Sequence, residues 1–119
     1  CGKGMDSEHD GEIYSSDHFV YPKYHLGNIK ERKLSTAILS QQQKKFGFDK
    51  KYGVPQYCRD CEHLTMCHGE CPKNRFIRTP MGEPGLNYLC SGLKKYFAHI
   101  DPYTKQLAAQ ARSNQVVTG

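Results

Sequence analysis

Four of the six cysteines in this chain lie within one short stretch, residues 58–72, which we call the cysteine cassette. They follow the spacing C-x2-C-x5-C-x3-C and are followed directly by a proline: Cys58, Cys61, Cys67, Cys71 and Pro72. A C-x2-C pair brings two thiols onto one turn of backbone, which suits a tetrahedral metal ion or an iron–sulfur cluster. Acidic residues and histidines fill the positions between, so the stretch is too polar for a buried strand. We therefore expect loops and a short helical turn around an inorganic centre.

The spacing leaves three interpretations open. Two disulfides would require an oxidising compartment, but the chain shows no secretion signal, so we expect reduced thiols and a cytoplasmic location. Structural zinc would take four thiolates, or three thiolates and an imidazole from His63 or His68. An iron–sulfur cluster is favoured, because in ferredoxins a cysteine followed by proline, as in Cys71-Pro72, reaches over to a second cluster. Cys90 is then the downstream cysteine available to complete the first.

Length and charge restrict the kind of molecule. At 119 residues the chain is one small domain or a piece of a larger one, and a loop-rich chain of this size gains stability from a metal. The net charge of +5 is spread over lysine pairs typical of solvated helix faces, so we expect no nucleic-acid partner. No apolar run approaches the length of a membrane span, so no membrane partner is expected. The chain begins with cysteine rather than methionine, which suggests an excised fragment.

The rest of the sequence predicts a small α+β fold, rich in loops and stapled by metal. An Asp-Gly turn predicts an N-terminal β-hairpin between Met5–Glu8 and Glu12–Tyr14. A short extended segment is expected at Leu26–Ile29.

Several short helices are predicted beside the hairpin. Ser35 is a candidate N-cap for a helix over Thr36–Phe46 that ends at Gly47. A helix is also expected from Asn87, and a separate one from Pro102 with Asp101 as its N-cap, because proline is tolerated in the first turn of a helix.

The chain resembles the C-terminal portion of anaerobic sulfatase-maturating enzymes, which are radical S-adenosylmethionine proteins. That portion is called the SPASM domain. The similarity runs from Cys1 to about Asp101 and rests on the cassette spacing, the final Cys90 and the stretch GEIYSSDHFVYP at Gly11–Pro22, with Leu26–Ile29 after it. The resemblance implies one SPASM-like domain over 1–119, divided into a hairpin half (1–32), a helical linker (33–56), a segment with the cassette and Cys90 (57–90) and C-terminal helices (91–119).

In such a domain two auxiliary 4Fe–4S clusters are expected. By resemblance, the second cluster would be held by Cys58, Cys61, Cys67 and Cys90. The first would use Cys1 and Cys71, a cysteine where Ser16 stands, and another upstream of the first residue. A serine hydroxyl is a poor iron ligand because it is not readily deprotonated and is less soft than a thiolate. We therefore expect the first cluster to be missing, degraded or replaced by another metal, such as zinc.

Asp17 is the one catalytic residue that the resemblance implies. In the family, an aspartate directly after the hairpin cysteine looks like the general base that takes a proton from the substrate side chain. From the sequence alone a turn-capping aspartate is the alternative. The nearby His9 and His18 are expected to be surface or packing residues.

The radical chemistry of the family uses a C-x3-C-x2-C loop in an N-terminal partial barrel, which is absent here. Cys67 and Cys71 give C-x3-C, but Asn74 stands where the third cysteine would be. The chain alone is therefore not expected to cleave S-adenosylmethionine, a cofactor of the full-length parent.

The implied function is to support, through an auxiliary cluster, the oxidation of a sulfatase Cys or Ser to Cα-formylglycine. The expected partners are the N-terminal radical domain, an unfolded sulfatase peptide and an electron donor or acceptor protein. The alternatives are a SPASM domain of another peptide-modifying radical enzyme and a zinc-stapled binding module.

Overall fold

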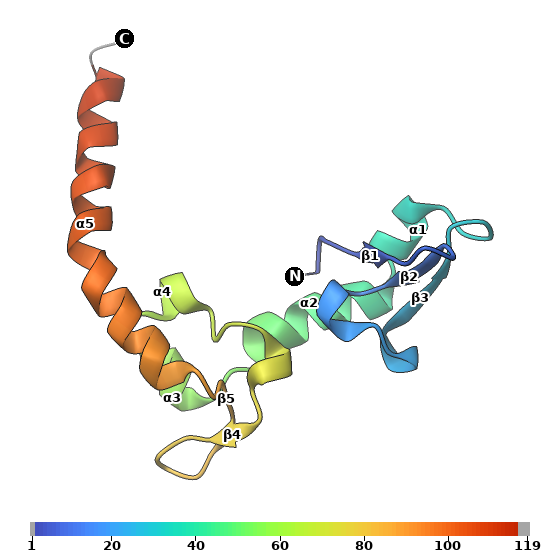
Figure 1. The fold of residues 1–119 in the computed structure, drawn as a ribbon, viewed down its shortest axis with the longest axis horizontal. Coiled ribbons are helices and arrows are strands. Elements are labelled where there is room, and N and C mark those ends of the chain that lie inside the picture. The colour runs from blue at the N-terminus through green and yellow to red at the C-terminus, as the bar shows by residue number, and fades with distance from the viewer. Residues whose placement is uncertain (1, 117–119) are drawn as a thin grey trace.

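The computed structural model describes residues 2–116 of the chain, and side chains as far as residue 113. It has two parts, an N-terminal sheet with two helices beside it and a C-terminal part built around the cassette (Figure 1). The radius of gyration is 18.4 Å, whereas a compact chain of this length would have about 13.5 Å. The molecule is therefore flat and open, and much of its surface lies far from any core.

The N-terminal part contains the predicted hairpin, extended to a three-stranded antiparallel sheet in the order β1-β2-β3. Its strands are β1 (Asp6–Ser7), β2 (Glu12–Tyr14) and β3 (His25–Asn28). The turn closes through Gly11, which has a φ of 91° and donates its N–H to the carbonyl of Glu8 at 2.9 Å. The Asp-Gly prediction is thus confirmed for the physical reason given, a positive φ that glycine adopts without strain.

A small apolar core lies between the sheet and α1 (Leu34–Ile38). Ile13 and Ala37 are fully buried and Leu26 is 2% exposed, with Met5 packed against them. The β2–β3 register pairs Ile13 with Gly27 and Tyr14 with His25, so Leu26 lies in a bulge between them. The bulge inserts one extra residue into β3, so that Leu26 can join Ile13 in this core.

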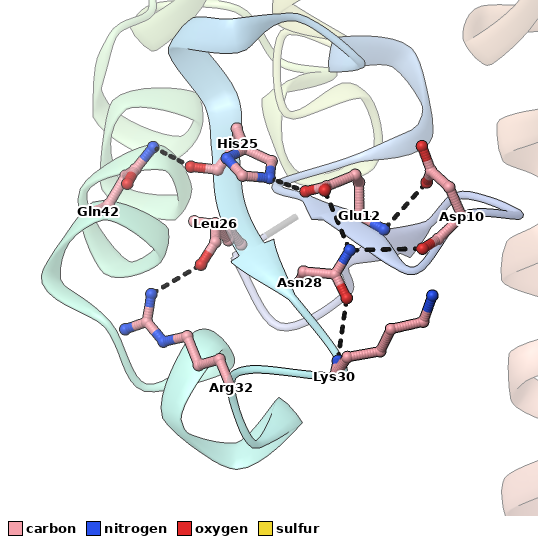
Figure 2. A network of polar contacts seen from close by, with 8 residues as sticks. All are labelled: Asp10, Glu12, His25, Leu26, Asn28, Lys30, Arg32 and Gln42. Carbon is pink, nitrogen blue, oxygen red and sulfur yellow. Dashed lines mark hydrogen bonds and ion pairs between the residues drawn. The ribbon is translucent and has the colours of Figure 1, made fainter.

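The outer face of the sheet carries a polar network (Figure 2). The Glu12 carboxylate accepts a hydrogen bond from Asn28 Nδ2 at 3.0 Å and lies against His25 Nε2. The bond from Asn28, followed by that from His25, lowers the pKa of Glu12. Gln42 Nε2 donates to the carbonyl of His25 at 3.1 Å, and Asp10 Oδ1 accepts from the N–H of Glu12 at 3.1 Å. The network therefore ties the hairpin turn and β3 to the helix that carries Gln42.

The predicted helix over Thr36–Phe46 is wrong in its boundaries. The chain forms α1 and then α2 (Gln41–Tyr52), because Ser40 Oγ accepts the N–H of Gln43 and caps a new helix. Gly47 does not end a helix but lies inside α2. A Cβ on Gly2 would lie 2.7 Å from the Cα of Gly47, so the two backbones pass in close contact.

The C-terminal part begins with α3 (Gln56–Arg59) and α4 (Leu64–Cys67), both within the cassette or next to it. A second hairpin, β4 (Ile77–Arg78) and β5 (Pro84–Leu86), lies between the cassette and the last helix. Short 3-10 turns occur at Asp17–Phe19, Pro22–Tyr24 and Pro72–Asn74.

The last helix, α5 (Cys90–Val116), is continuous, so the separate helix predicted from Pro102 is wrong. Pro102 removes one backbone donor inside the helix, and the helix continues through it. The side chains of residues 102–113 are all exposed, including Tyr103 at 59% and Leu107 at 63%. This half of α5 projects away from the rest of the molecule (Figure 1).

Gln43 provides the first test of the fold. Its side chain is fully buried, and Nε2 donates to the carbonyls of Gly4 at 2.8 Å and Ser15 at 3.3 Å. We expect Gln43→Ala to lower the free energy of unfolding by about 2 kcal/mol, because the carbonyls of Gly4 and the buried Ser15 lose their donor. Urea unfolding measures the change. The exposed Gln41→Ala is the control and should stay within about 0.5 kcal/mol of the parent; equal effects would contradict this role for Gln43.

Candidate metal centre

Four cysteines from separate segments line one cavity. Cys58 lies on α3, Cys61 on the turn after it, Cys67 at the end of α4, and Cys90 at the start of α5. The rest of the lining is Tyr57, His63, Leu64, Gly69, Leu93, Lys94 and Phe97. All four thiols are half-buried and free. The structure therefore brings Cys90 to the three cassette cysteines named with it in the sequence analysis. We call this space the cysteine cavity.

Backbone hydrogen bonds shape the cassette around the cavity. The N–H of Cys61 donates to the carbonyl of Cys58 at 3.2 Å, and the N–H of Cys67 donates to that of His63 at 2.8 Å. After Cys67 the chain turns through three residues with positive φ: His68 at 49°, Gly69 at 70° and Glu70 at 52°. This left-handed run ends α4 and leads the chain to Cys71.

Arg75 holds the left-handed run in place. Its guanidinium donates to the carbonyls of His68 at 3.1 Å, Gly69 at 2.9 Å and Glu70 at 2.8 Å. A fourth bond of 2.9 Å reaches the carbonyl of Lys50 on α2. Because the guanidinium presents several donors in a fixed plane, one side chain satisfies carbonyls that a helix end would otherwise leave unpaired. Arg75 thus connects the cassette to the N-terminal part.

Two further polar contacts place the helices that carry cysteines. The Glu83 carboxylate accepts the N–H of Gln56 at 2.8 and 2.9 Å, at the first residue of α3. Asn87, 3% exposed, accepts the N–H of Leu89 at its Oδ1 and the N–H of Cys90 at its carbonyl. The second hairpin and the start of α5 are in this way fixed relative to the cavity.

The thiols of Cys58, Cys67 and Cys90 are predominantly protonated in the absence of a metal. Burial, followed by the nearby thiolate charges of Cys90, Cys67 and Cys61, raises the pKa of Cys58. Burial also raises the pKa of Cys67 and of Cys90. Because metal ligation requires thiolates, binding must release protons and becomes easier as the pH rises. Four soft sulfur donors lining one cavity have the ligand chemistry of an iron–sulfur cluster or of zinc and not that of a hard cation.

Cys71 does not line the cysteine cavity. Its Sγ lies 3.3 Å from Nδ1 of His18, on the 3-10 turn after the first hairpin. The sequence analysis assigned His18 to the surface or to packing; its side chain is 58% exposed but contacts Cys71. Cys1, the other cysteine expected at the first cluster, lies outside the described residues.

Ser16 and Asp17 lie at this second location. Ser16 Oγ donates to Asp17 Oδ1 at 2.9 Å, and the backbone N–H of His18 donates to the same oxygen at 3.0 Å. The bond from Ser16 is the largest of the effects that lower the pKa of Asp17. Because its pKa is lowered, Asp17 is ionised at neutral pH. Its side chain is 73% exposed, so the carboxylate is open to a proton donor from outside the domain.

The two cassette histidines differ in position. His63 lines the cysteine cavity, and its side chain is 12% exposed beside Phe97. His68 lies instead in a neighbouring cleft with Lys51 and Arg59. Among the described residues, no three His, Cys, Asp or Glu side chains have the arrangement of a site for a single metal ion.

Sequence reasoning missed several residues of this centre, namely Tyr57, Arg75, Glu83, Asn87 and Lys94. Lys94 could have been found, because it follows Cys90 by four positions and so shares its face of α5. Arg75, Glu83 and Asn87 act through backbone contacts that spacing alone does not reveal, and Tyr57 acts through the hydrogen bond that it accepts from Lys94.

Comparison with known proteins identifies the class of this domain. A family model described as an iron–sulfur cluster-binding domain, SPASM, matches residues 2–62, and the chain belongs to this family. It is 46% identical, over 97% of its own length, to a serine-type anaerobic sulfatase-maturating enzyme from Bacteroides thetaiotaomicron. It is 27% identical, over 80% of its length, to a cysteine-type anaerobic sulfatase-maturating enzyme from Clostridium perfringens. The chain spans 28% of the first relative and 25% of the second.

Solved structures give the same relationship. Native anSMEcpe with bound AdoMet superposes on 92% of this chain with a TM-score of 0.71 and 25% identity, and the match covers 30% of that chain. Native anSMEcpe with bound AdoMet and a Kp18Cys peptide gives a TM-score of 0.69 over 91% of this chain and 31% of that one. The predicted membership of the SPASM domains of anaerobic sulfatase-maturating enzymes and the predicted α+β fold are thus confirmed.

Arg75 provides a test of how the cassette is held. We expect Arg75→Lys to lower the free energy of local opening at residues 68–70 by about 2 kcal/mol, because an ammonium group cannot reach four carbonyls together. The exchange rate of the Glu70 amide, which donates to the carbonyl of Cys67 at 2.8 Å, measures this opening. Arg78 makes a single exposed bond to the carbonyl of Gly82, so Arg78→Lys is the matched control. An unchanged exchange rate of the Glu70 amide in Arg75→Lys would show that Arg75 does not hold the left-handed run in place.

Proposed function

We propose that the cysteine cavity holds one 4Fe–4S cluster through Cys58, Cys61, Cys67 and Cys90, and that this cluster transfers electrons. The observation that carries the proposal is the convergence of these four thiols on one cavity, in a chain that belongs to a family of iron–sulfur domains. With four thiolate ligands, a cluster would have no open iron position. That arrangement suits electron transfer better than binding of substrate to iron.

The second location is proposed to be a defective first-cluster site. Cys71 and Cys1 are the thiols assigned to it, and Ser16 stands where a further thiolate would be expected. The hydroxyl of Ser16 is hydrogen-bonded to Asp17, which leaves it still less suited to iron. We therefore propose a missing or degraded cluster at this location, or zinc in its place.

The activity of the whole protein is proposed from the relatives. The parent would combine this chain with an N-terminal radical S-adenosylmethionine domain and oxidise a Ser or Cys on an unfolded sulfatase peptide to Cα-formylglycine, in the cytoplasm. Forming the aldehyde from a serine removes one hydrogen atom from Cβ, one proton from the hydroxyl and one electron. The 5′-deoxyadenosyl radical formed in the N-terminal domain would accept the hydrogen atom. Asp17, ionised and exposed, would take the proton, and the cluster would pass the electron to a protein partner. None of the helices within residues 2–116 combines the length and apolar character needed to cross a bilayer.

Metal analysis tests the cluster assignment. After anaerobic reconstitution we expect about four irons and four sulfides per chain, with a brown colour. Cys90→Ala should remove most of the iron, whereas Cys71→Ala should leave it unchanged, because Cys71 does not line the cysteine cavity. A colourless chain that binds zinc in stoichiometric amount and takes up no iron under anaerobic reconstitution with iron and sulfide would favour the zinc-stapled module. About eight irons would mean that the second location also assembles a cluster.

Asp17 is tested in the full-length parent. Asp17→Asn removes the proton acceptor but keeps the size and the hydrogen bond from Ser16, so formylglycine formation should fall by at least about 100-fold. Iron content should remain that of the unaltered enzyme. Asp10→Asn, on the exposed hairpin turn, is the control and should keep full activity. Retained activity in Asp17→Asn would show that Asp17 only caps its turn.

A further inference from the structure

Two polar side chains of the cysteine cavity have no role in the function proposed above. Tyr57 directly precedes Cys58, and Lys94 lies four residues after Cys90. Lys94 Nζ donates a hydrogen bond to Tyr57 Oη at 2.8 Å and lies 4.2 Å from the centre of its ring. The contact joins α5 to the residues of α3 and so links the two helices that carry Cys90 and Cys58.

Lys94 brings a positive charge close to the thiols. It is half-buried, and among the described residues no carboxylate forms an ion pair with it. The hydrogen bond with Tyr57 is the largest cause of its raised pKa, and the charges at Cys61 and Cys90 act in the same direction. In return Lys94 opposes the effect of burial on the pKa of Cys90. The ammonium group is therefore charged at neutral pH and interacts electrostatically with two of the four proposed ligands.

We propose that Lys94, held in place by Tyr57, is a positioning residue that raises the reduction potential of the cluster at the cysteine cavity. The inference rests on the proposed function, because it requires a redox cluster there. Reduction adds one electron to the cluster and its thiolates, so their negative charge grows by one unit. A fixed cation beside them stabilises the reduced form more than the oxidised form.

Lys94 can be distinguished from the other cation near the thiols, Arg75. The charges at Cys58, Cys71 and Cys67 act on the Arg75 guanidinium, but its donors are taken up by four backbone carbonyls. Changing Arg75 would alter the cassette itself. Lys94 makes no hydrogen bond to the backbone of the cassette, so its charge can be removed with the ligand loops intact.

The test is a redox titration of the reconstituted chain, followed by electron paramagnetic resonance of the reduced cluster. Lys94→Gln should lower the equilibrium constant for one-electron reduction about tenfold, a shift of about 59 mV to lower potential. This is the size expected for a unit charge about 10 Å away in a medium with an effective dielectric constant of about 20. Lys94→Arg keeps the charge and should stay within about threefold of the parent.

Two more variants separate position from charge alone. Tyr57→Phe keeps the ring but removes the hydrogen-bond acceptor, so it should lower the potential by part of the Lys94→Gln shift. Lys95→Gln is the matched control, because Lys95 is the next residue of α5, carries the same charge and is exposed. Its shift should be less than half of that in Lys94→Gln.

Iron and sulfide content is measured on every variant. Equal shifts in Lys94→Gln and Lys95→Gln would overturn the proposal, since only the net charge would then matter. An unchanged reduction potential in Tyr57→Phe would overturn the positioning role of Lys94. If Lys94→Gln does not retain its cluster, Tyr57→Phe alone tests that role. A parent chain that assembles no iron would instead refute the proposed function, which the metal count distinguishes from both other outcomes.

Discussion

The architecture of the C-terminal part depends on bringing four cysteine thiols, from three separate segments, to one cavity. Cys58 and Cys61 follow from local turns, but Cys67 and Cys90 reach the same cavity only if the loops around them are held. That restraint comes from polar side chains bonded to backbone: Arg75 on the left-handed run, Glu83 at the start of α3 and Asn87 at the start of α5. The centre is therefore held by hydrogen bonds more than by an apolar core, and ligation of the proposed cluster would add to them.

The two locations of the cassette are adjacent yet chemically different. The cysteine cavity is half-buried, and the thiols of Cys58, Cys67 and Cys90 have raised pKa values, so it favours soft metals that displace protons. The second location is exposed, where Cys71 meets His18 from the first hairpin, next to the ionised Asp17. The short left-handed run between Cys67 and Cys71 separates the proposed electron-transfer centre from the surface proposed for proton transfer.

Much of this could be predicted from sequence where the cause is local. The hairpin followed from Asp-Gly, and the approach of Cys90 to the cassette was expected because Cys90 is the available downstream cysteine and because the family resemblance implies it. The helix boundaries were wrong because competing local signals are decided by packing. Ser40 rather than Ser35 provides a cap, and Gly47 serves a close backbone contact rather than a helix end. The roles of Arg75 and Glu83 were not predictable, since their partners are backbone atoms, and two of these, on Lys50 and Gln56, lie 25 and 27 residues away in the sequence. The ligand roles themselves remain predictions.

The long final helix has an unequal distribution of anchors. Near Cys90, the side chains of Leu93 and Phe97 line the cysteine cavity, whereas the side chains of residues 102–113 are all exposed. Starting a helix is the costly step and lengthening it is cheap, so the anchored turns serve as a preformed nucleus from which the projecting half extends. Pro102 interrupts this propagation by one missing bond. The helical order of the projecting half therefore depends on the anchored turns, and a disturbance at Cys90 would destabilise α5 along its length.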